Sequence, residues 1–362
     1  MSSEIGSIIK TTVFGESHGP AIGAVMDAPP AGYTIDFEEL KLQMSRRAPG
    51  QDPTATARKE ADNPEFLSGL LENVTTGAPL ALIIRNNDTR SHNYSNIADR
   101  PRPSHADYAA SVRFNGFNDI RGGGNFSARL TAPLVAAGNV ARQILSANGI
   151  TVGGHVAKIG SVSDLELDPV NVTKEQLTEL NTKYFSTIST EKQQLMYEEI
   201  AKAKQEGDSV GGSVEIAVLG LPVGVGSPTA RGIENVISSA IYCVPAVKGV
   251  EFGSGFSFAE MHGSSANDSM YYDGDKVMCR TNNCGGITGG ISNGMPLIIK
   301  AALKPTPSIA KEQDTVNLKS KENDKLIVEG RHDPCIVPRA LPAIEAAVCL
   351  ALLDILTEVK KL

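Results

Sequence analysis

The sequence has few cysteines, no surplus of positive charge and no recognisable leader. Its five cysteines, among 362 residues, are an odd number without a C-x-x-C pair, which favours reduced thiols over a disulfide scaffold or a zinc site. A net charge of −7 argues against general nucleic-acid binding, which needs a basic surface. The N-terminus has no signal region, and no apolar run suggests a membrane span. We therefore expect a cytoplasmic protein that binds neither nucleic acid nor membrane and holds no metal.

Two glycine clusters, at 122–124 and 285–294, match neither the dinucleotide fingerprint nor the P-loop in spacing. The first lies between Arg121 and an apolar, helix-like run from 127 to 148. Glycine lets the backbone approach a ligand closely, and the N–H groups at the start of a following helix favour an anion. Arg121 and Arg129 could add charge-assisted hydrogen bonds. A tight loop with surface arginines is an equally good interpretation of this stretch.

The hydrophobic pattern predicts a mixture of strands and helices. Strands are expected at 8–14, 21–26, 209–219 and 296–303, with a hairpin between 66 and 84. Helices are expected at 36–44, 127–148, 233–243 and 341–359. The stretch 163–208 is rich in Glu, Lys, Gln and Thr, which predicts a peripheral, solvent-facing region with a helix at 190–205. Because no split point is evident, we expect one domain over residues 1–362.

Three histidines lie in glycine-flanked or polar loops. His18 sits between glycines at a strand-to-strand turn, His105 ends a polar segment, and His332 lies in a short motif at 330–335. An imidazole exposed to a cleft can transfer protons near neutral pH, although a polar turn histidine without chemistry is equally compatible. The remaining histidines are expected to be structural: His92, His155 and His262.

Arginines recur in the otherwise uncharged, glycine-rich stretches of this acidic chain. Arg46 and Arg47 are adjacent and precede a Pro-Gly breaker, a pattern that solvated charge alone would also explain. Arg102 and Arg331 each stand close to one of the loop histidines. Arginine holds phosphate or carboxylate bidentately, so the set suits the binding of a small polyanion with proton transfer by histidine.

Eight motifs together resemble the chorismate synthase family. Each is a weak signal, but they occur in the family's order and extend over nearly the whole chain. The motifs are Gly15-Glu16-Ser17-His18-Gly19, Arg46-Arg47 with Pro49-Gly50, Arg102-Pro103-Ser104-His105-Ala106-Asp107, Arg121-Gly122-Gly123-Gly124 through Ser127-Ala128-Arg129, Ala246-Val247-Lys248-Gly249-Val250-Glu251, Gly289-Gly290-Ile291-Ser292, Lys304-Pro305-Thr306 and Gly330-Arg331-His332-Asp333-Pro334-Cys335.

The resemblance implies a lyase that converts 5-enolpyruvylshikimate 3-phosphate to chorismate by a 1,4-anti elimination of phosphate, the last common step toward the aromatic amino acids. The family requires reduced FMN although the reaction has no net redox change; the flavin donates an electron transiently and its N5 accepts the hydrogen from C6. The resemblance also implies a single α+β domain, with helices sandwiched between antiparallel β-sheets, assembled as a homotetramer. Whether NADPH reduces the flavin is left open.

The resemblance also assigns roles to individual residues. It implies that His18 protonates the departing phosphate, that His105 protonates the reduced flavin, and that Asp333 helps to deprotonate flavin N5. The residues implied to contact the substrate anions are Arg46, Arg47, Arg102, Ser127, Arg129 and Arg331. The residues implied to hold the flavin are Asn125, Phe126, Ser127, Pro245, Ala246, Gly289, Lys304, Pro305, Thr306, Pro307, Ser308 and Arg331.

The sequence departs from the family pattern at a few positions. Asn125 and Phe126 replace a common Arg-Ser, Leu130 replaces a glutamate, Pro245 replaces an asparagine, and Pro53 stands where an arginine is frequent. These changes put the phosphate and flavin contacts in question more than the reaction. One alternative is therefore a catalytically altered relative that binds FMN or a phosphorylated ligand without turnover. Another is a non-enzymatic phosphate-binding protein in which every motif is structural.

Overall fold

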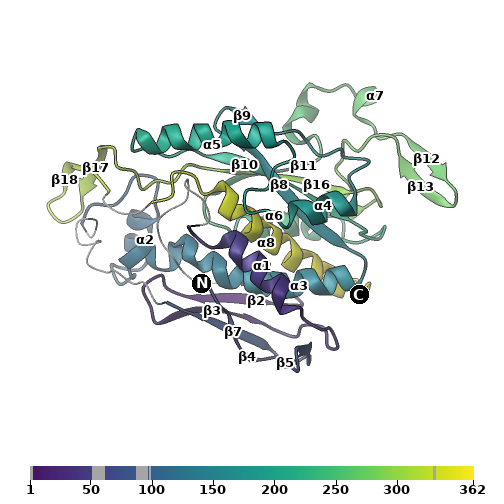
Figure 1. Ribbon diagram of the computed structural model, residues 1–362, viewed down its shortest axis with the longest axis horizontal. Coiled ribbons are helices and arrows are strands. Elements are labelled where there is room, and N and C mark those ends of the chain that lie inside the picture. Colours follow the sequence, from purple (N-terminus) through teal and green to yellow (C-terminus); the bar gives the residue numbers. More distant parts are fainter. Residues whose placement is uncertain (1–2, 51–61, 87–96, 98, 329–331) are drawn as a thin grey trace.

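The structure is a computed structural model that describes residues 3–50, 62–86, 97, 99–328 and 332–362. Two five-stranded antiparallel sheets enclose a layer of helices (Figure 1). Hydrophobic side chains from both sheets and from the helices between them form one continuous core. The predicted α+β fold, with helices sandwiched between antiparallel sheets, is confirmed.

The first sheet is built from the N-terminal part of the chain, in the order β1-β2-β3-β7-β4. Its strands are β1 (Glu4–Ile5), β2 (Thr11–Gly15), β3 (Ala21–Met26), β4 (Glu65–Ser68) and β7 (Leu80–Arg85). Along β7, Leu80, Leu82 and Ile84 are buried and alternate with more exposed residues, as expected for a sheet with one covered face. The predicted hairpin between 66 and 84 is confirmed, because β4 pairs with β7; two short strands lie at its turn, β5 (Leu70–Leu71) and β6 (Val74–Thr75).

The second sheet has the order β11-β16-β10-β8-β9. Its strands are β8 (Thr151–Ile159), β9 (Val162–Ser163), β10 (Gly212–Leu219), β11 (Val247–Phe252) and β16 (Leu297–Leu303). The central strand β10 pairs with β16 on one side and β8 on the other, and both pairings are antiparallel. The strands predicted at 209–219 and 296–303 are therefore present, at the centre of this sheet.

The helices between the sheets are α1 (Phe37–Arg47), α3 (Thr131–Ala147), α6 (Ile233–Ile241) and α8 (Val337–Glu358). Helix α3 contacts β3 and β7 of the first sheet, and α8 contacts β8 and β10 of the second. The two helices approach so closely that a Cβ on Gly138 would clash with Ala346, so glycine is needed there. The helix expected at 127–148 begins only at Thr131, because a short 3₁₀ turn over Ala128–Leu130 precedes it.

By length and composition, α8 is the one helix among the described residues that could cross a membrane, with a mean hydropathy of 1.9 over its most apolar window. The sequence-based expectation that no apolar run reaches that length is wrong. However, 94% of this window is buried inside the molecule, between the two sheets. A helix that is apolar all round is expected at such a position in a large core.

Region 163–208 lies on the outer side of the second sheet, where it forms α4 (Lys174–Leu180) and α5 (Thr190–Gln205) (Figure 1). Met196 and Ile200 anchor α5 in the main core, while Leu177 and Leu180 of α4 pack with residues of the sheet in a small separate cluster. The predicted helix at 190–205 is confirmed.

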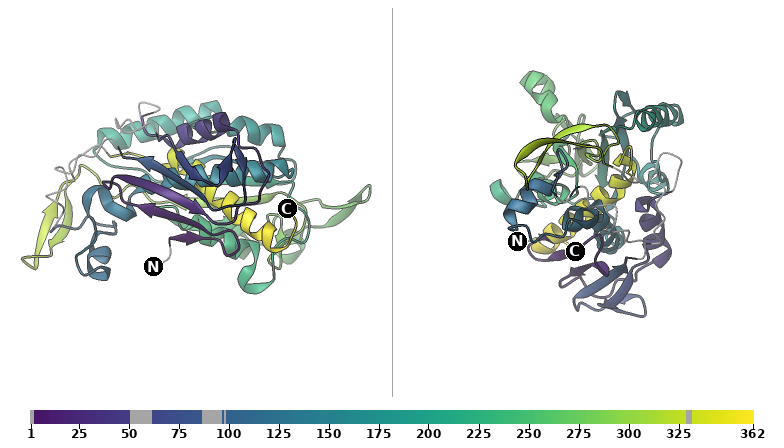
Figure 2. Two further views of the ribbon diagram at one scale, coloured as in Figure 1. Left: turned by 90° about the horizontal axis from the view of Figure 1, so that it is seen from below. Right: turned by 90° about the vertical axis from the view of Figure 1, so that its left-hand side faces the viewer.

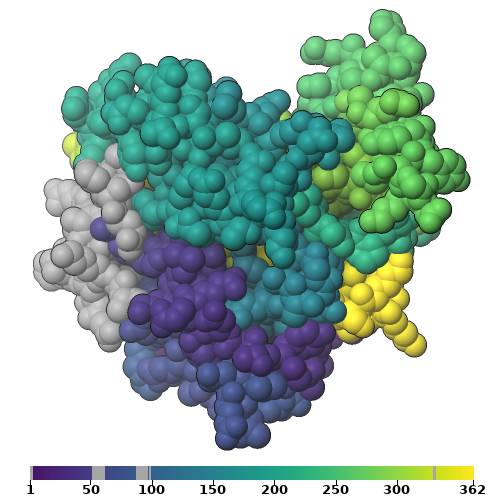
Figure 3. Space-filling model, turned by 45° about the vertical axis from the view of Figure 1, so that its right-hand side comes forward, coloured from purple at the N-terminus to yellow at the C-terminus, as the bar shows by residue number. Residues whose placement is uncertain are grey.

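Smaller elements project from both ends of the molecule. The hairpin β12 (Met270–Asp273) and β13 (Lys276–Cys279) extends from one end with α7 (Gly263–Ala266), and Figure 3 shows this segment standing out from the body. The hairpin β17 (Gln313–Asn317) and β18 (Glu322–Leu326) lies at the opposite end (Figure 2). The remaining elements are α2 (Asp107–Arg113), β14 (Ile287–Thr288), β15 (Ile291–Ser292) and 3₁₀ turns at Arg121–Phe126, Thr229–Arg231 and Gly255–Glu260.

Candidate active site

A cavity of about 470 Å³ collects most of the sequence-predicted site residues, although they are far apart in the chain. It is lined by the ends of helices and strands and by the loops that connect them. The predicted residues that line it are Arg47, Arg102, His105, Asn125, Phe126, Ser127, Arg129, Pro245, Ala246, Lys304, Thr306, Pro307, Ser308 and Asp333. Further lining residues include Pro49, Cys243, His332, Ile336 and Arg339. We call this space the central cavity.

The three glycines at 122–124 form a tight turn beside the central cavity. Their φ angles are +61°, +83° and +53°, values at which residues with a side chain are strained. A Cβ on Gly122 would lie 2.6 Å from His18 Cδ2 and 2.7 Å from Ser17 Oγ, so the turn packs directly on the His18 loop. His18 is buried, and Ser17 Oγ is a buried hydroxyl without a hydrogen-bond partner in the described part of the chain. Sequence reasoning had not singled out Ser17.

Two of the predicted arginines share one buried carboxylate. Asp62 pairs through one oxygen with Arg47 and through the other with Arg129. Burial alone would raise the pKa of Asp62, but the two guanidinium groups outweigh this effect and lower it below its ordinary value. Arg47 also donates to Thr131 Oγ1 at 3.0 Å, and Arg129 to Asn86 Oδ1 at 3.1 Å. The cluster thus presents two oriented cations against one anion.

Arg102, His105 and Asp107 form a second charged group at the start of α2. Arg102 Nε donates to Asp107 Oδ2 at 2.8 Å and its Nη2 to Asp107 Oδ1 at 2.9 Å. His105 Nδ1 lies 2.6 Å from Asp107 Oδ1. Arg102 Nη1 reaches across to Ser308 Oγ at 3.1 Å, so this group is joined to the chain that follows β16.

The segment after β16 supplies cations, hydroxyls and prolines. Lys304 donates from Nζ to the Ser104 carbonyl, and burial together with the nearby Lys248 lowers the pKa of Lys304. Thr306 Oγ1 is buried and has no hydrogen-bond partner among the described residues. A buried hydroxyl without a partner is costly, and Thr306 is also one of the residues that line the cavity.

Asp333 faces a residue that sequence reasoning missed. Its carboxylate pairs with Arg339 in the first turn of α8, and Arg339 Nε donates to the Arg47 carbonyl at 3.1 Å. Arg339 therefore connects the Asp333 wall of the cavity with the Arg47 wall. The available signal was a single arginine near the start of a mostly apolar helix.

Several predicted residues lie outside the lining. Arg46 is buried in the helix layer and pairs with Glu345, so its position does not support the predicted substrate contact. Gly289 and Pro305 are not among the residues that line the cavity, and neither is His18, which is next to it behind Gly122. Arg331 and Pro53 lie outside the described residues, as does His92. Within the described ranges, no group of three or more His, Cys, Asp or Glu residues could hold a metal ion.

Comparison with known proteins decides the family. The model of the family described as chorismate synthase matches residues 9–357. The chain belongs to the chorismate synthase family. A chorismate synthase of Dehalococcoides mccartyi is 43% identical over 98% of this chain and 96% of its own length, and one of Methanocaldococcus jannaschii is 44% identical over 97% and 95%.

A crystal structure of a chorismate synthase has the same fold, with a TM-score of 0.75 at 28% identity, over 98% of this chain and 93% of the other. The family resemblance seen in the motifs is therefore confirmed. In this chorismate synthase family member, most of the motifs converge on the central cavity or on the glycine turn beside it, although the motif at Gly289–Ser292 does not line it.

Proposed function

We propose that this protein is a lyase that eliminates phosphate from 5-enolpyruvylshikimate 3-phosphate to give chorismate, in the last common step toward the aromatic amino acids, with reduced FMN bound. The observation that carries the proposal is the convergence of Arg47, Arg102, Arg129 and Lys304 on one cavity in a member of the chorismate synthase family. The substrate carries two carboxylates and a phosphate, which such a set of cations binds with charge-assisted hydrogen bonds.

The arginines would hold the substrate. Asp62 fixes the guanidinium groups of Arg47 and Arg129, so the two cations are oriented before a ligand arrives. Preorganised cations lower the entropic cost of binding an anion and stabilise negative charge that develops on a leaving phosphate. Arg102 and Arg339, which also line the cavity, and Ser127 complete the polar wall. By the same resemblance Arg331 would belong to this set.

The chemistry of the lining also fits FMN. A flavin needs cations and hydroxyls for its phosphate and ribityl chain, and flat apolar surfaces for its ring. The cavity offers Lys304, Thr306 and Ser308 for the first purpose, and Phe126, Pro245, Ala246, Pro307 and Ile336 for the second. The Thr306 hydroxyl without a partner supports this assignment. When bound, reduced FMN would supply transient electron density and accept the hydrogen that leaves C6.

The protein's own residues would carry out the proton transfers. His18 would protonate the departing phosphate; it packs directly behind Gly122, which lines the cavity. His105 would protonate the cofactor and Asp333 would help to remove a proton, and both line the cavity. We further propose assembly as a homotetramer, with NADPH as a possible reductant of the flavin in the cell; mass photometry and an NADPH oxidation assay test these two points.

The test is an anaerobic assay with purified protein, dithionite-reduced FMN and 5-enolpyruvylshikimate 3-phosphate, in which chorismate absorbance and released phosphate are followed together. Chorismate and phosphate in equal amounts are expected. Binding of flavin and substrate without either product would refute turnover and favour the catalytically altered relative, for which the presence of Asn125 and Phe126 on the cavity wall provides the specific reason. Absence of binding would refute both.

A further inference from the structure

His105 has its Nδ1 atom in a very short contact with a carboxylate. Nδ1 lies 2.6 Å from Asp107 Oδ1, on the first residue of α2. The same carboxylate accepts from Arg102 three times, from the backbone N–H at 3.0 Å, from Nε at 2.8 Å and from Nη2 at 2.9 Å. Asp107 is therefore held on both oxygens, and its side chain is only 11% exposed.

This arrangement determines which ring nitrogen carries the proton. Burial would raise the pKa of Asp107, but the hydrogen bonds from Arg102 and His105 outweigh it and place the pKa well below its ordinary range. Asp107 is thus ionised at neutral pH and has no proton to donate. Two lone pairs cannot face each other at 2.6 Å, so the Nδ1 atom of His105 must be the donor. Arg102 Nη2 also lies 3.0 Å from Nδ1, besides donating to Asp107 Oδ1 at 2.9 Å. If Nδ1 accepted from Arg102, its lone pair would face the ionised Oδ1 at 2.6 Å, so the shorter contact decides the tautomer.

The opposite nitrogen, Nε2, faces the glycine turn. A Cβ built on Gly123 would lie 3.6 Å from both Cε1 and Nε2 of His105, so the glycine leaves room beside this atom. Among the described residues, Lys304 also reaches the loop, through the Ser104 carbonyl. With Nδ1–H committed to Asp107, Nε2 is the atom that exchanges a proton in the neutral ring.

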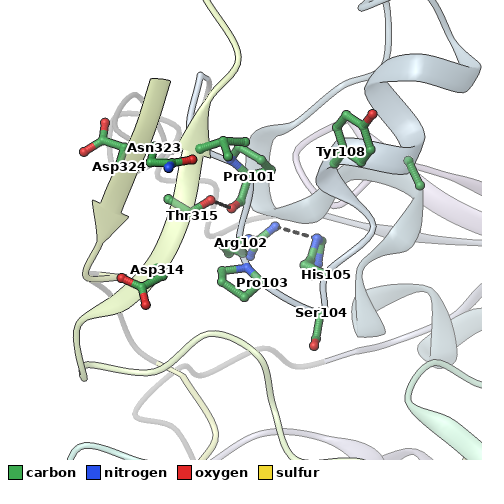
Figure 4. Close-up of a pocket in the computed structure, with 12 residues that line it drawn as sticks. Pro101, Arg102, Pro103, Ser104, His105, Tyr108, Asp314, Thr315, Asn323 and Asp324 are labelled. Carbon is green, nitrogen blue, oxygen red and sulfur yellow. Dashed lines mark hydrogen bonds between the residues drawn. The ribbon is translucent and has the colours of Figure 1, made fainter. Parts of the chain in front are cut away.

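His105 also separates two spaces. On its other side lies an open groove of about 740 Å³ between α2 and the β17–β18 hairpin, and Figure 4 shows His105 and Ser104 on its wall opposite Asp314 and Thr315. The His105 side chain is 16% exposed. A ring with solvent on one side and ligand on the other would sample several orientations unless one nitrogen were anchored.

We infer that Asp107 is a positioning residue, clamped by Arg102, that holds His105 as the Nδ1–H tautomer and leaves Nε2 to transfer the proton. The inference deepens the proposed function and rests on it for the role of His105. The tautomer itself is a property of the protein without ligands. It can therefore be measured whether or not the reaction occurs.

The experiment combines solid-state NMR of ¹⁵N-histidine-labelled protein with steady-state kinetics, for the wild type and for Asp107→Asn and Asp107→Glu. The His105 signals are assigned from their loss in His105→Gln, and spectra are recorded over a pH series so that the neutral ring is observed. In the wild type, Nδ1 should carry the proton. In Asp107→Asn, the Nε2–H form should appear and kcat should fall about ten- to a hundredfold with little change in KM, because general acid–base help is worth on the order of 10²–10⁴. Asp107→Glu should restore part of the Nδ1–H population and part of kcat.

Asp208→Asn is the matched control, since Asp208 forms an exposed pair with Lys311 and should alter neither the tautomer nor kcat. Binding of FMN and the unfolding midpoint show whether Asp107→Asn is folded. If it is not folded, the tautomer and kcat of Asp107→Glu alone test the inference. An Nε2–H tautomer in the wild type, or an unchanged tautomer and kcat in a folded Asp107→Asn, overturns the inference. A fixed Nδ1–H tautomer in a protein without turnover would instead support the inference about Asp107 and refute the proposed function.

Discussion

Arg46 and Glu345 form a buried ion pair, in which Arg46 Nη1 lies 2.7 Å from Oε2 and Nη2 lies 3.2 Å from Oε1. The pair joins the last turn of α1 to α8, and Arg142 of α3 donates to the same carboxylate at 2.7 Å. Arg47, the next residue, instead reaches the central cavity. Side chains of successive helix residues point about 100° apart, so Arg46 faces the helix layer while Arg47 faces the cavity.

Replacement of Arg46 by methionine should therefore act on stability and not on substrate binding. It leaves the Glu345 charge with one partner fewer in the core, and loss of one member of a buried pair costs about 3–5 kcal/mol. Denaturant unfolding of Arg46→Met measures this. The control is Arg85→Met, whose exposed pair with Glu65 should leave the unfolding midpoint almost unchanged. A normal unfolding midpoint combined with a raised KM would show that Arg46 contacts the substrate, as the family resemblance implies.

Thr306→Val should weaken flavin binding without loss of stability. Valine has nearly the same shape and removes a buried hydroxyl that has no partner within the described structure, so the free energy of unfolding should stay the same or rise. Loss of one neutral hydrogen bond to a ligand corresponds to a two- to tenfold weaker Kd, from about 0.5–1.5 kcal/mol.

Titration of FMN in the presence of substrate gives this Kd. Thr315→Val is the comparison, because the Thr315 hydroxyl donates to the Pro101 carbonyl at 2.6 Å and its removal should lower stability instead. Unchanged FMN affinity in Thr306→Val would show that the hydroxyl does not face the ligand.

His18→Ala should lower kcat by about 10²–10⁴ while substrate still binds, because a general acid acts in the transition state. Single-turnover phosphate release and equilibrium substrate binding separate the two effects. His262→Ala, at an exposed histidine before α7, should behave like the wild type in both assays. If His18→Ala loses binding and turnover in parallel, His18 has a structural role beside the glycine turn.

The stability of the protein should fall as the pH rises above about 6.5. His155 is fully buried, with Nδ1 2.9 Å from Asp164 and Nε2 2.9 Å from Glu215. Burial opposes the charged ring, but the hydrogen bonds to the two carboxylates outweigh it and raise the pKa of His155 above its ordinary value. The folded protein then binds this proton more tightly than the unfolded chain. The stabilisation that protonated His155 gives the folded state is fully present below the unfolded pKa of about 6.5. It is lost as the pH rises through the folded pKa.

Unfolding free energies between about pH 6.5 and 8, below the range in which thiols titrate, test this point. The expected result is a loss of stability with a slope of at most about 1.4 kcal/mol per pH unit, the limit for one proton. His262→Asn should keep the slope, since His262 lies exposed at the surface. A stability that is constant or increases over this range would mean that His155 is neutral in the folded protein.

The parts of the fold that sequence predicts best are those with a strong local pattern. The apolar runs that became α3 and α8, and the strands β3, β10 and β16, follow from periodicity and length. The glycine turn at 122–124 was also identified, because positive φ angles at consecutive residues require glycine. The helix after it begins later than predicted, since Ser127 accepts from the Arg129 N–H at 3.2 Å and caps a separate 3₁₀ turn.

The residues that sequence reasoning missed act through contacts between distant segments. Asp62 pairs with Arg47, which is 15 residues away in the sequence, and with Arg129, which is 67 residues away. Arg46 pairs with Glu345 at a separation of 299 residues. No local spacing encodes such pairs, because the tertiary fold alone brings them together. Glu345 in particular looks like an ordinary polar residue in an apolar helix until its two arginine partners are placed beside it.

The central claim is that one cavity holds both the flavin and the substrate. A crystal structure of the protein with FMN and 5-enolpyruvylshikimate 3-phosphate, obtained without oxygen, tests it most directly. We expect both ligands in the central cavity, with the substrate anions against Arg47, Arg102 and Arg129 and the flavin within hydrogen-bond distance of Thr306 Oγ1. Ligands bound instead in the outer groove beside Asp314, with the central cavity empty, would contradict the claim.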